Sequence, residues 1–279
     1  MQPRAWIIFP LVFTLTYIWF KSTMSLPASS PYNEEKIITQ INTVYNLLLK
    51  LSYFTPDRIN FPPKDGHTIN EELCRSLHLT PAVVFLMKRI PYVIDGYHKP
   101  IIWQSRAFEY TLDEEIRKGR DPERADAVID EDELRMDFLR PWELALTCWL
   151  DDGISVILDT KSSKLFSRLP DNESEPVDDF REESEAHDAP TYLQKIIDDI
   201  RNLEVVYSPS RDSESIHLSG CYEQVEVKRI LINEFGWGTE EFREEDWRRE
   251  GQEIYERIES EGIERWEERQ RNAPAPTYI

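Results

Sequence analysis

Glycine, cysteine and histidine are scarce in this 279-residue sequence, which contains nine glycines, three cysteines and five histidines. Phosphate-binding loops and the G-x-S-x-G turn of serine hydrolases both need glycines at fixed spacing. None of these motifs occurs, and the run Ser219-Gly-Cys221 does not match the hydrolase turn. The chain therefore lacks the common sequence signatures of nucleotide binding and of an exposed serine nucleophile.

The three cysteines, Cys74, Cys148 and Cys221, are an odd number at wide separations, which does not suit a disulfide framework. We expect reduced, buried thiols. Cys148 lies in the apolar run 144–150, where a thiol packs as a small hydrophobic group and its pKa is expected to rise. This environment argues against a nucleophilic role for Cys148.

The histidines form no H-E-x-x-H motif and show no pairing with cysteine at the spacing that zinc ligands usually have. They are His67, His78, His98, His187 and His217. Residues 121–132 resemble a calcium loop only in acidity, because Asp126 replaces the required glycine and the twelfth position is not glutamate. The sequence thus predicts no metal and no cofactor, and it predicts that these acidic side chains are solvated.

Acidic residues outnumber basic ones by 53 to 33, which gives a formal net charge of −20. A chain with this charge repels phosphate backbones and anionic lipid headgroups, so nucleic acid is not an expected partner. A protein with a basic or apolar surface suits the charge better. Asp151 and Asp152 could form an acid–base pair, but adjacent carboxylates in a predicted turn normally face water, and we predict no catalytic residue.

Residues 5–20 (AWIIFPLVFTLTYIWF) carry no charge and form an apolar segment. As a helix they would rise about 24 Å, less than the roughly 30 Å of a bilayer core, and Pro10 would kink them. Three interpretations remain open. The segment is a single-pass membrane anchor, a signal peptide without the usual A-x-A cleavage site, or upstream sequence ahead of a start at Met24.

These interpretations place the body of the protein differently. An uncleaved anchor puts the body on the lumenal side, where Asn172, in the only N-glycosylation sequon, would be open to glycosylation. A start at Met24 leaves an acidic, cysteine-poor body that is expected to be cytoplasmic. Membrane contact is expected only through residues 5–20.

Amphipathic spacing and capping residues predict helices. These cover residues 34–51, 70–77, 80–89, 191–203 and 225–235. Strands are predicted at 92–95 and 101–103 around a turn, and at 144–149, 154–159 and 165–169 as an antiparallel meander. Residues 113–133 are predicted to be loop and exposed helix.

The alternation of the meander predicts one buried side of the sheet, facing the helix at 34–51 or the one at 191–203. The residues on that side are Leu144, Leu146, Cys148, Ile154, Val156 and Leu158. The acidic segment 170–190 has no apolar periodicity and is predicted to be a disordered loop. The charged tail is predicted to form exposed helices, interrupted at Gly251 and Gly262, that pack back on the body.

These patterns together predict an α+β fold in which an antiparallel β-meander packs with several helices. Residues 1–23 form the apolar segment, residues 24–236 a single main domain with the acidic loop 170–190, and residues 237–279 a charged helical tail.

Six short runs resemble an uncharacterised family of filamentous-fungal proteins. They are 77–84 (LHLTPAVV), 90–93 (IPYV), 139–142 (LRPW), 146–149 (LTCW), 189–193 (APTYL) and 241–249 (EFREEDWRR). The resemblance spans residues 30–260 and implies no known activity. Members of that family begin near the equivalent of Met24, which favours the start at that residue.

A second resemblance, in the order of elements, is to the SUKH superfamily. It rests on a helix that ends at 90–92, strands around 152–153, a strand that ends at 158–159, and a helix that opens at 190–193. That superfamily includes yeast regulators of cell-wall synthesis and bacterial toxin-immunity proteins, which act by binding partners. This chain has a single glycine where the superfamily has a glycine-rich turn.

The absence of catalytic signatures and the acidic charge favour a non-enzymatic protein-interaction module. Its contacts are expected through the acidic loops or the tail, with Trp247 and Trp266 as anchors. The alternative is an enzyme whose carboxylates come together only in the folded protein, in a deep pocket where their pKa values are shifted.

Overall fold

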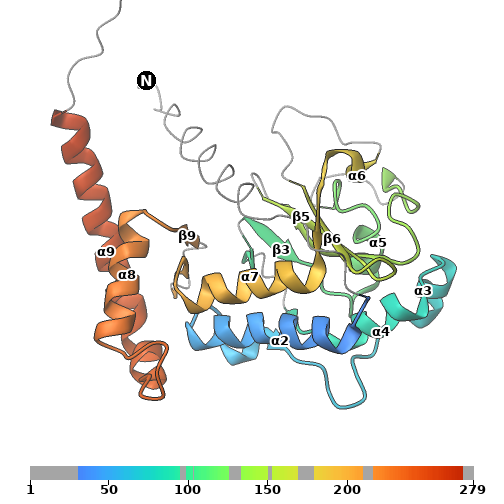
Figure 1. Cartoon of the computed structure of the whole chain (residues 1–279), viewed down its shortest axis with the longest axis horizontal. Helices are drawn as coiled ribbons and strands as arrows, with labels where there is room; N and C mark the ends of the chain where they lie inside the picture. Colours follow the sequence, from blue (N-terminus) through green and yellow to red (C-terminus); the bar gives the residue numbers. More distant parts are fainter. Residues whose placement is uncertain are drawn as a thin grey trace, which may run out of the picture.

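A computed structural model describes residues 31–94, 99–102, 104–125, 133–149, 153–168, 179–209 and 216–272. The predicted apolar segment 5–20, the turn residues Asp151 and Asp152, and the sequon residue Asn172 lie outside these ranges. The described residues form helices and antiparallel sheets in an α+β fold, as predicted (Figure 1).

The helices begin and end close to where the capping residues predict. Their bounds are α2 (Glu34–Lys50), α3 (Glu71–Ser76), α4 (Pro81–Arg89), α5 (Asp113–Lys118), α6 (Phe180–Glu183), α7 (Ala189–Arg201), α8 (Tyr222–Asn233) and α9 (Glu244–Asn272), with a 3-10 turn η1 (Pro56–Arg58). Asn33 caps α2 by accepting a hydrogen bond from the backbone N–H of Lys36, and Asp188 caps α7 in the same way. Local side chains therefore define where these two helices start.

Nine strands form three antiparallel sheets within the described residues. The strands are β1 (Ile59–Asn60), β2 (Tyr92–Val93), β3 (Ser105–Ala107), β4 (Glu143–Trp149), β5 (Ser155–Asp159), β6 (Lys164–Arg168), β7 (Glu185–Asp188), β8 (Val205–Tyr207) and β9 (Ile216–Leu218). The main sheet has the order β3-β4-β5-β6-β7, so the predicted meander is confirmed as its three central strands. Strand β2 pairs with β1 and not with the segment at 101–103, which corrects that part of the prediction.

A β-bulge in β4 changes the predicted alternation of buried residues. Leu144 lies opposite Leu158, but Thr147 lies opposite Val156, because the register shifts between Ala145 and Thr147. The bulge moves Cys148 to the other side of the sheet from Leu144 and Thr147. The prediction of one continuous face from Leu144 to Cys148 is therefore wrong, although Cys148 is fully buried.

Both faces of the main sheet are covered, by different parts of the chain. On one face, the ring of His187 in β7 lies 4.9 Å from that of Tyr192 in α7. On the other face, Phe166 contacts Phe180 of α6, with ring centroids 5.6 Å apart. Helix α2 packs against α7, and the side-chain amide of Gln40 donates a 2.8 Å hydrogen bond to a carbonyl at the start of α7. The described core therefore extends from α2 through α7 into the sheet.

The second half of the predicted acidic loop is ordered structure. Residues Phe180–Glu183 form α6 and Glu185–Asp188 form the edge strand β7, so the prediction of a disordered loop is wrong for this part. Phe180 is fully buried between the rings of Phe138 and Phe166. Burial of Phe180, the ion pair of Arg181 with Glu143 and the pairing of β7 with β6 hold this segment in place, although its composition is acidic. The rest of the predicted loop, residues 170–178, lies outside the described ranges.

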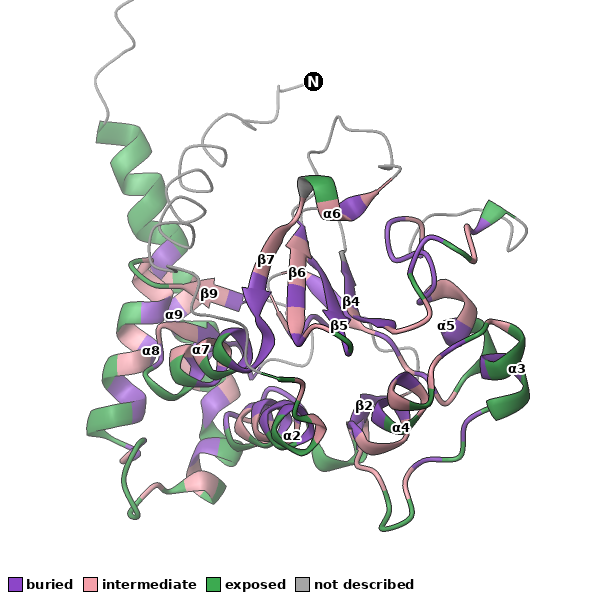
Figure 2. Ribbon diagram, turned by 45° about the vertical axis from the view of Figure 1, so that its right-hand side comes forward, coloured by how far each residue is buried: buried purple, intermediate pink, exposed green. Residues whose placement is uncertain are grey.

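Residues 244–272 of the charged tail form one continuous 29-residue helix, α9, and not a set of helices broken at glycines. A Cβ atom at position 251 would lie 3.0 Å from the Trp247 ring, and one at position 262 would collide with the Glu223 carboxylate. Both glycines therefore allow close packing, which explains why they lie inside the helix despite their low helix propensity. Helix α9 packs beside α8 at one end of the molecule (Figures 1 and 2). None of the helices in the described part of the chain combines the length and apolarity needed to cross a membrane.

Candidate functional site

The two tryptophans predicted as interaction anchors occupy different environments on α9. Trp247 is 1% exposed, and its indole N–H donates a 2.9 Å hydrogen bond to the carbonyl oxygen of Leu51. Its ring also meets Phe235 edge to face, with centroids 5.2 Å apart. Trp247 therefore anchors the tail helix to the body of the same chain and is not open to a partner.

Trp266 lies near the far end of the same helix and is 49% exposed. The buried residues of α9 are Trp247, Gly251, Tyr255, Ile258 and Gly262. Trp266 follows Gly262 by four residues, so it continues the buried stripe one turn further along the helix. Residues 263–272 are all exposed, and Figure 2 shows this end of α9 standing clear of α8.

Within the described residues, α8 contacts the far end of α9 through its own first residue, Tyr222. The hydroxyl of Tyr222 donates a 2.6 Å hydrogen bond to Glu261, and the guanidinium of Arg265 lies 4.3 Å from the centroid of the Tyr222 ring. The apolar stripe of α9 continues to Trp266, past the start of α8. Ile263, three residues before Trp266, is 56% exposed. The end of α9 thus presents two large apolar side chains, Ile263 and Trp266, beyond the part of the helix that packs on α8.

The alternative function, an enzyme with carboxylates brought together by the fold, requires buried carboxylates without a neutralising partner. Several buried carboxylates lie on one face of the main sheet. Glu115 binds Arg106 at 2.7 Å, and both side chains are less than 9% exposed. Asp121, also fully buried, binds Arg135 at 2.8 Å, which corrects the prediction that it is solvated. Because each of these buried carboxylates is neutralised by an arginine, their arrangement suits structural ion pairs more than general acid–base chemistry.

Two further ion pairs with buried carboxylates lie on this face of the sheet. The Arg168 guanidinium contacts Glu123, and that of Arg181 contacts Glu143. Burial raises the pKa of Glu123, while the charge of Arg168 opposes that rise. The partner of Glu123 comes from β6, so the pair ties the segment after α5 to the sheet.

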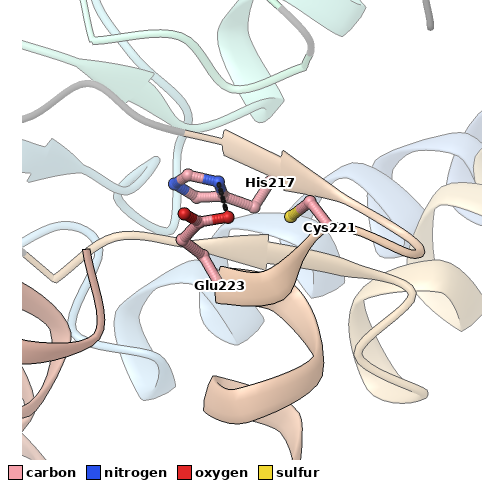
Figure 3. Close-up of side chains that lie close together, drawn as sticks. All are labelled: His217, Cys221 and Glu223. Atoms are coloured by element: carbon pink, nitrogen blue, oxygen red, sulfur yellow. Dashed lines mark ion pairs between the residues drawn. The ribbon is translucent and has the colours of Figure 1, made fainter. Parts of the chain in front are cut away.

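A cluster of different chemistry lies where β9, α8 and α9 meet (Figure 3). His217 is the middle residue of β9, Cys221 is the N-cap of α8, and Glu223 lies in the first turn of α8. One ligand atom from each residue lies within 4.8 Å of the others. The chain reverses between His217 and Cys221 through Gly220, whose φ of 94° is readily adopted only by glycine. The spacing H-x-x-x-C-x-E thus places three donor side chains on one side of a tight turn.

The protonation states in this cluster follow from burial. Burial lowers the pKa of His217, so its imidazole is neutral at pH 7. Burial and the nearby Glu223 carboxylate raise the pKa of the Cys221 thiol to about 11, although the backbone N–H of Gln224 acts in the opposite direction. In this state Cys221 is a protonated thiol and not a thiolate nucleophile.

The sequence alone does not predict this cluster, because the five histidines form no known metal-binding motif. The signal present was the short spacing of histidine, cysteine and glutamate around Gly220, shortly before the predicted helix at 225–235. The other described cysteines, Cys74 and Cys148, are buried and reduced, as expected. Comparison with known proteins adds no relative: no family model, no curated protein and no solved structure matches this chain.

Proposed function

We propose that this protein is a non-enzymatic interaction module that binds a partner protein through the exposed end of α9. The observation that carries the proposal is the continuation of the buried stripe of α9 into Trp266, which is 49% exposed. A helix whose apolar stripe extends past its own support offers the spaced anchors that helix-in-groove recognition uses. Tryptophan is among the residues that contribute most to such interfaces.

The charge around the anchors defines the chemistry of the partner. Residues 259–268 contain five glutamates and one arginine, Arg265. A partner that accepts Trp266 and Ile263 therefore has an apolar recess with a basic rim. Contacts at the rim are screened by salt, so the complex weakens as ionic strength rises.

Site-specific crosslinking in the full chain tests this proposal. A photoreactive phenylalanine analogue replaces Ile263 in one variant and Glu268, on the opposite side of the helix, in a matched control. In native cell lysate, position 263 should give a discrete heteromeric product that position 268 does not give. Excess unlabelled wild-type chain should compete for this product, whereas the unlabelled Trp266→Ala chain should not.

The same experiment can contradict the proposal in three ways. Equal crosslinking from both positions would indicate non-specific contact. A product of twice the chain mass would show that a second copy covers the helix, and equal competition by the Trp266→Ala chain would remove the proposed anchor.

A further inference from the structure

We infer that His217, Cys221 and Glu223 form a binding site for a divalent transition-metal ion, with zinc as the expected ion. The inference does not depend on the proposed function. It starts from the donor set, which offers imidazole nitrogen, sulfur and carboxylate oxygen from three residues within 4.8 Å of one another. These are the three donor types that proteins use for zinc, whereas magnesium and calcium prefer oxygen alone.

The imidazole of His217 is not satisfied by hydrogen bonds within the described residues. Its Nδ1 atom lies 3.9 Å from Glu223 Oε2, too far for a hydrogen bond, and its Nε2 atom is buried without a partner. Two other buried histidines differ: a ring nitrogen of His67 lies 3.0 Å from the carbonyl oxygen of Ile90, and one of His187 lies 3.1 Å from the Ser167 hydroxyl. The unsatisfied ring of His217 therefore has a different role from these two structural histidines.

The distances suit a metal after a small contraction. Zinc lies about 2.0 to 2.3 Å from nitrogen, oxygen and sulfur ligands, which places tetrahedral ligands roughly 3.5 Å apart. The ligand atoms, now up to 4.8 Å apart, would need to move closer by about 1 Å. Rotation about the side-chain bonds allows a movement of this size. Figure 3 shows the Glu223 carboxylate next to the His217 ring, with the Cys221 sulfur beside them.

The surrounding residues hold the three donors in position. Gln224, which is 3% exposed, accepts a 3.1 Å hydrogen bond from the backbone N–H of Gly220 and donates one to the carbonyl of Leu203. Its own backbone N–H lies 3.3 Å from the sulfur of Cys221. These bonds fix the turn between His217 and Cys221, as supporting hydrogen bonds do around metal ligands in general.

Helix α9 closes the site from the other side. Gly262 leaves room for the Glu223 carboxylate, because a Cβ atom there would collide with it. The ring of Tyr255 lies 5.5 Å from that of His217. A metal held here would join β9 and α8 at the point where α9 packs on them. Three protein ligands leave a fourth position for water, as in open zinc sites.

Metal titration of the full chain tests the inference. After chelator treatment, the wild-type chain should bind one equivalent of Zn²⁺ in competition with a chromophoric chelator. Both His217→Gln and Cys221→Ser should weaken binding by at least about 100-fold, and Gln224→Ala by about 10- to 100-fold. The controls His78→Asn, at an exposed histidine, and Cys74→Ala should retain wild-type affinity.

Co²⁺ substitution provides a second readout that does not depend on how the variants fold. The wild-type chain and Cys74→Ala should both show the thiolate-to-cobalt charge-transfer band and the d–d bands of a tetrahedral site. Absence of the charge-transfer band in the wild type would overturn the inference. So would Zn²⁺ affinity that is unchanged in folded His217→Gln and Cys221→Ser.

Discussion

The indole N–H of Trp247 donates a hydrogen bond to the carbonyl oxygen of Leu51, which joins the tail helix to the C-cap of α2 across 196 residues of sequence. The last carbonyls of a helix have no partner within it, so this bond satisfies one of them. Trp247, Tyr255 and Ile258 belong to the same hydrophobic core as α2 and the sheet. The tail is thus part of the folded body over its first half.

Replacing Trp247 by alanine should therefore destabilise the whole protein. Truncation of a buried tryptophan costs about 3 to 5 kcal/mol, and the carbonyl of Leu51 would lose its partner as well. Trp266→Ala, the same change on the same helix, should alter the free energy of unfolding by less than about 0.5 kcal/mol. Urea unfolding followed by circular dichroism measures both. Similar losses in the two variants would contradict the division of α9 into a packed half and an exposed half.

The ion pair between Arg168 and Glu123 should behave as a buried pair. Both side chains are at most 4% exposed, so Glu123→Gln should cost about 3 to 5 kcal/mol by leaving a buried guanidinium uncompensated. The exposed pair Glu244–Arg248 is the control, and its removal should cost less than about 0.5 kcal/mol. Double-mutant cycles in urea measure the two coupling energies. Equal coupling in the two pairs would refute a buried pair on the sheet.

The side chain of Thr147 should stabilise the fold, because the bulge in β4 places its hydroxyl between two backbone groups at the start of the neighbouring strand. Its hydroxyl donates a 2.9 Å hydrogen bond to the carbonyl of Ile154 and accepts a 3.1 Å bond from the backbone N–H of Val156. Thr147→Val keeps the shape but leaves both buried groups unsatisfied, at an expected cost of about 1 to 3 kcal/mol. Thr39→Val on the exposed face of α2 is the matched control, with little expected loss. Thermal melts that rank the two changes equally would argue against this bulge.

Much of the fold follows from periodicity and capping. Asn33 caps α2 where its start is predicted, and the turn residues of 160–163 separate β5 from β6, so these elements can be located without a structure. Asp188, in contrast, caps α7 from within the segment predicted to be a disordered loop. The bulge cannot, because Leu144, Leu146 and Cys148 alternate perfectly in sequence and only tertiary packing shifts Thr147 opposite Val156.

The remaining differences have similar physical causes. Strand β1 contains only two residues, too few to show alternation, so the partner of the predicted strand at 92–95 is not apparent from the sequence. Segment 180–188 has the composition of a disordered loop, yet Phe180 is buried and residues 185–188 pair with β6. The cluster of His217, Cys221 and Glu223 depends on the turn at Gly220, which brings β9 back beside the first turn of α8. These contacts join residues that only the fold brings together, so amino-acid composition does not reveal them.

Acidification should destabilise the protein through buried histidines. Burial lowers the pKa of His187 below the ordinary value of 6.5, while the charge of Glu185 acts against this shift. As pH falls, the unfolded chain takes up a proton before the folded one, so stability present above about pH 6.5 is lost toward the lower folded pKa. His187→Gln should reduce the slope of stability against pH between roughly 7 and 5, and His78→Asn should not. Identical slopes in wild type and His187→Gln would contradict burial of a neutral imidazole.

The accessibility of Trp266 in the isolated full chain is the most direct test of the account. With fluorotryptophan incorporated, the ¹⁹F resonances of Trp247 and Trp266 can be assigned from their Trp→Phe variants, and a soluble nitroxide then reports which ring faces solvent. We predict strong broadening of the Trp266 resonance and none of the Trp247 resonance, in accord with exposed fractions of 49% and 1%. A Trp266 resonance protected as well as that of Trp247 would show that the end of α9 is already covered, and would contradict its assignment as the partner-binding surface.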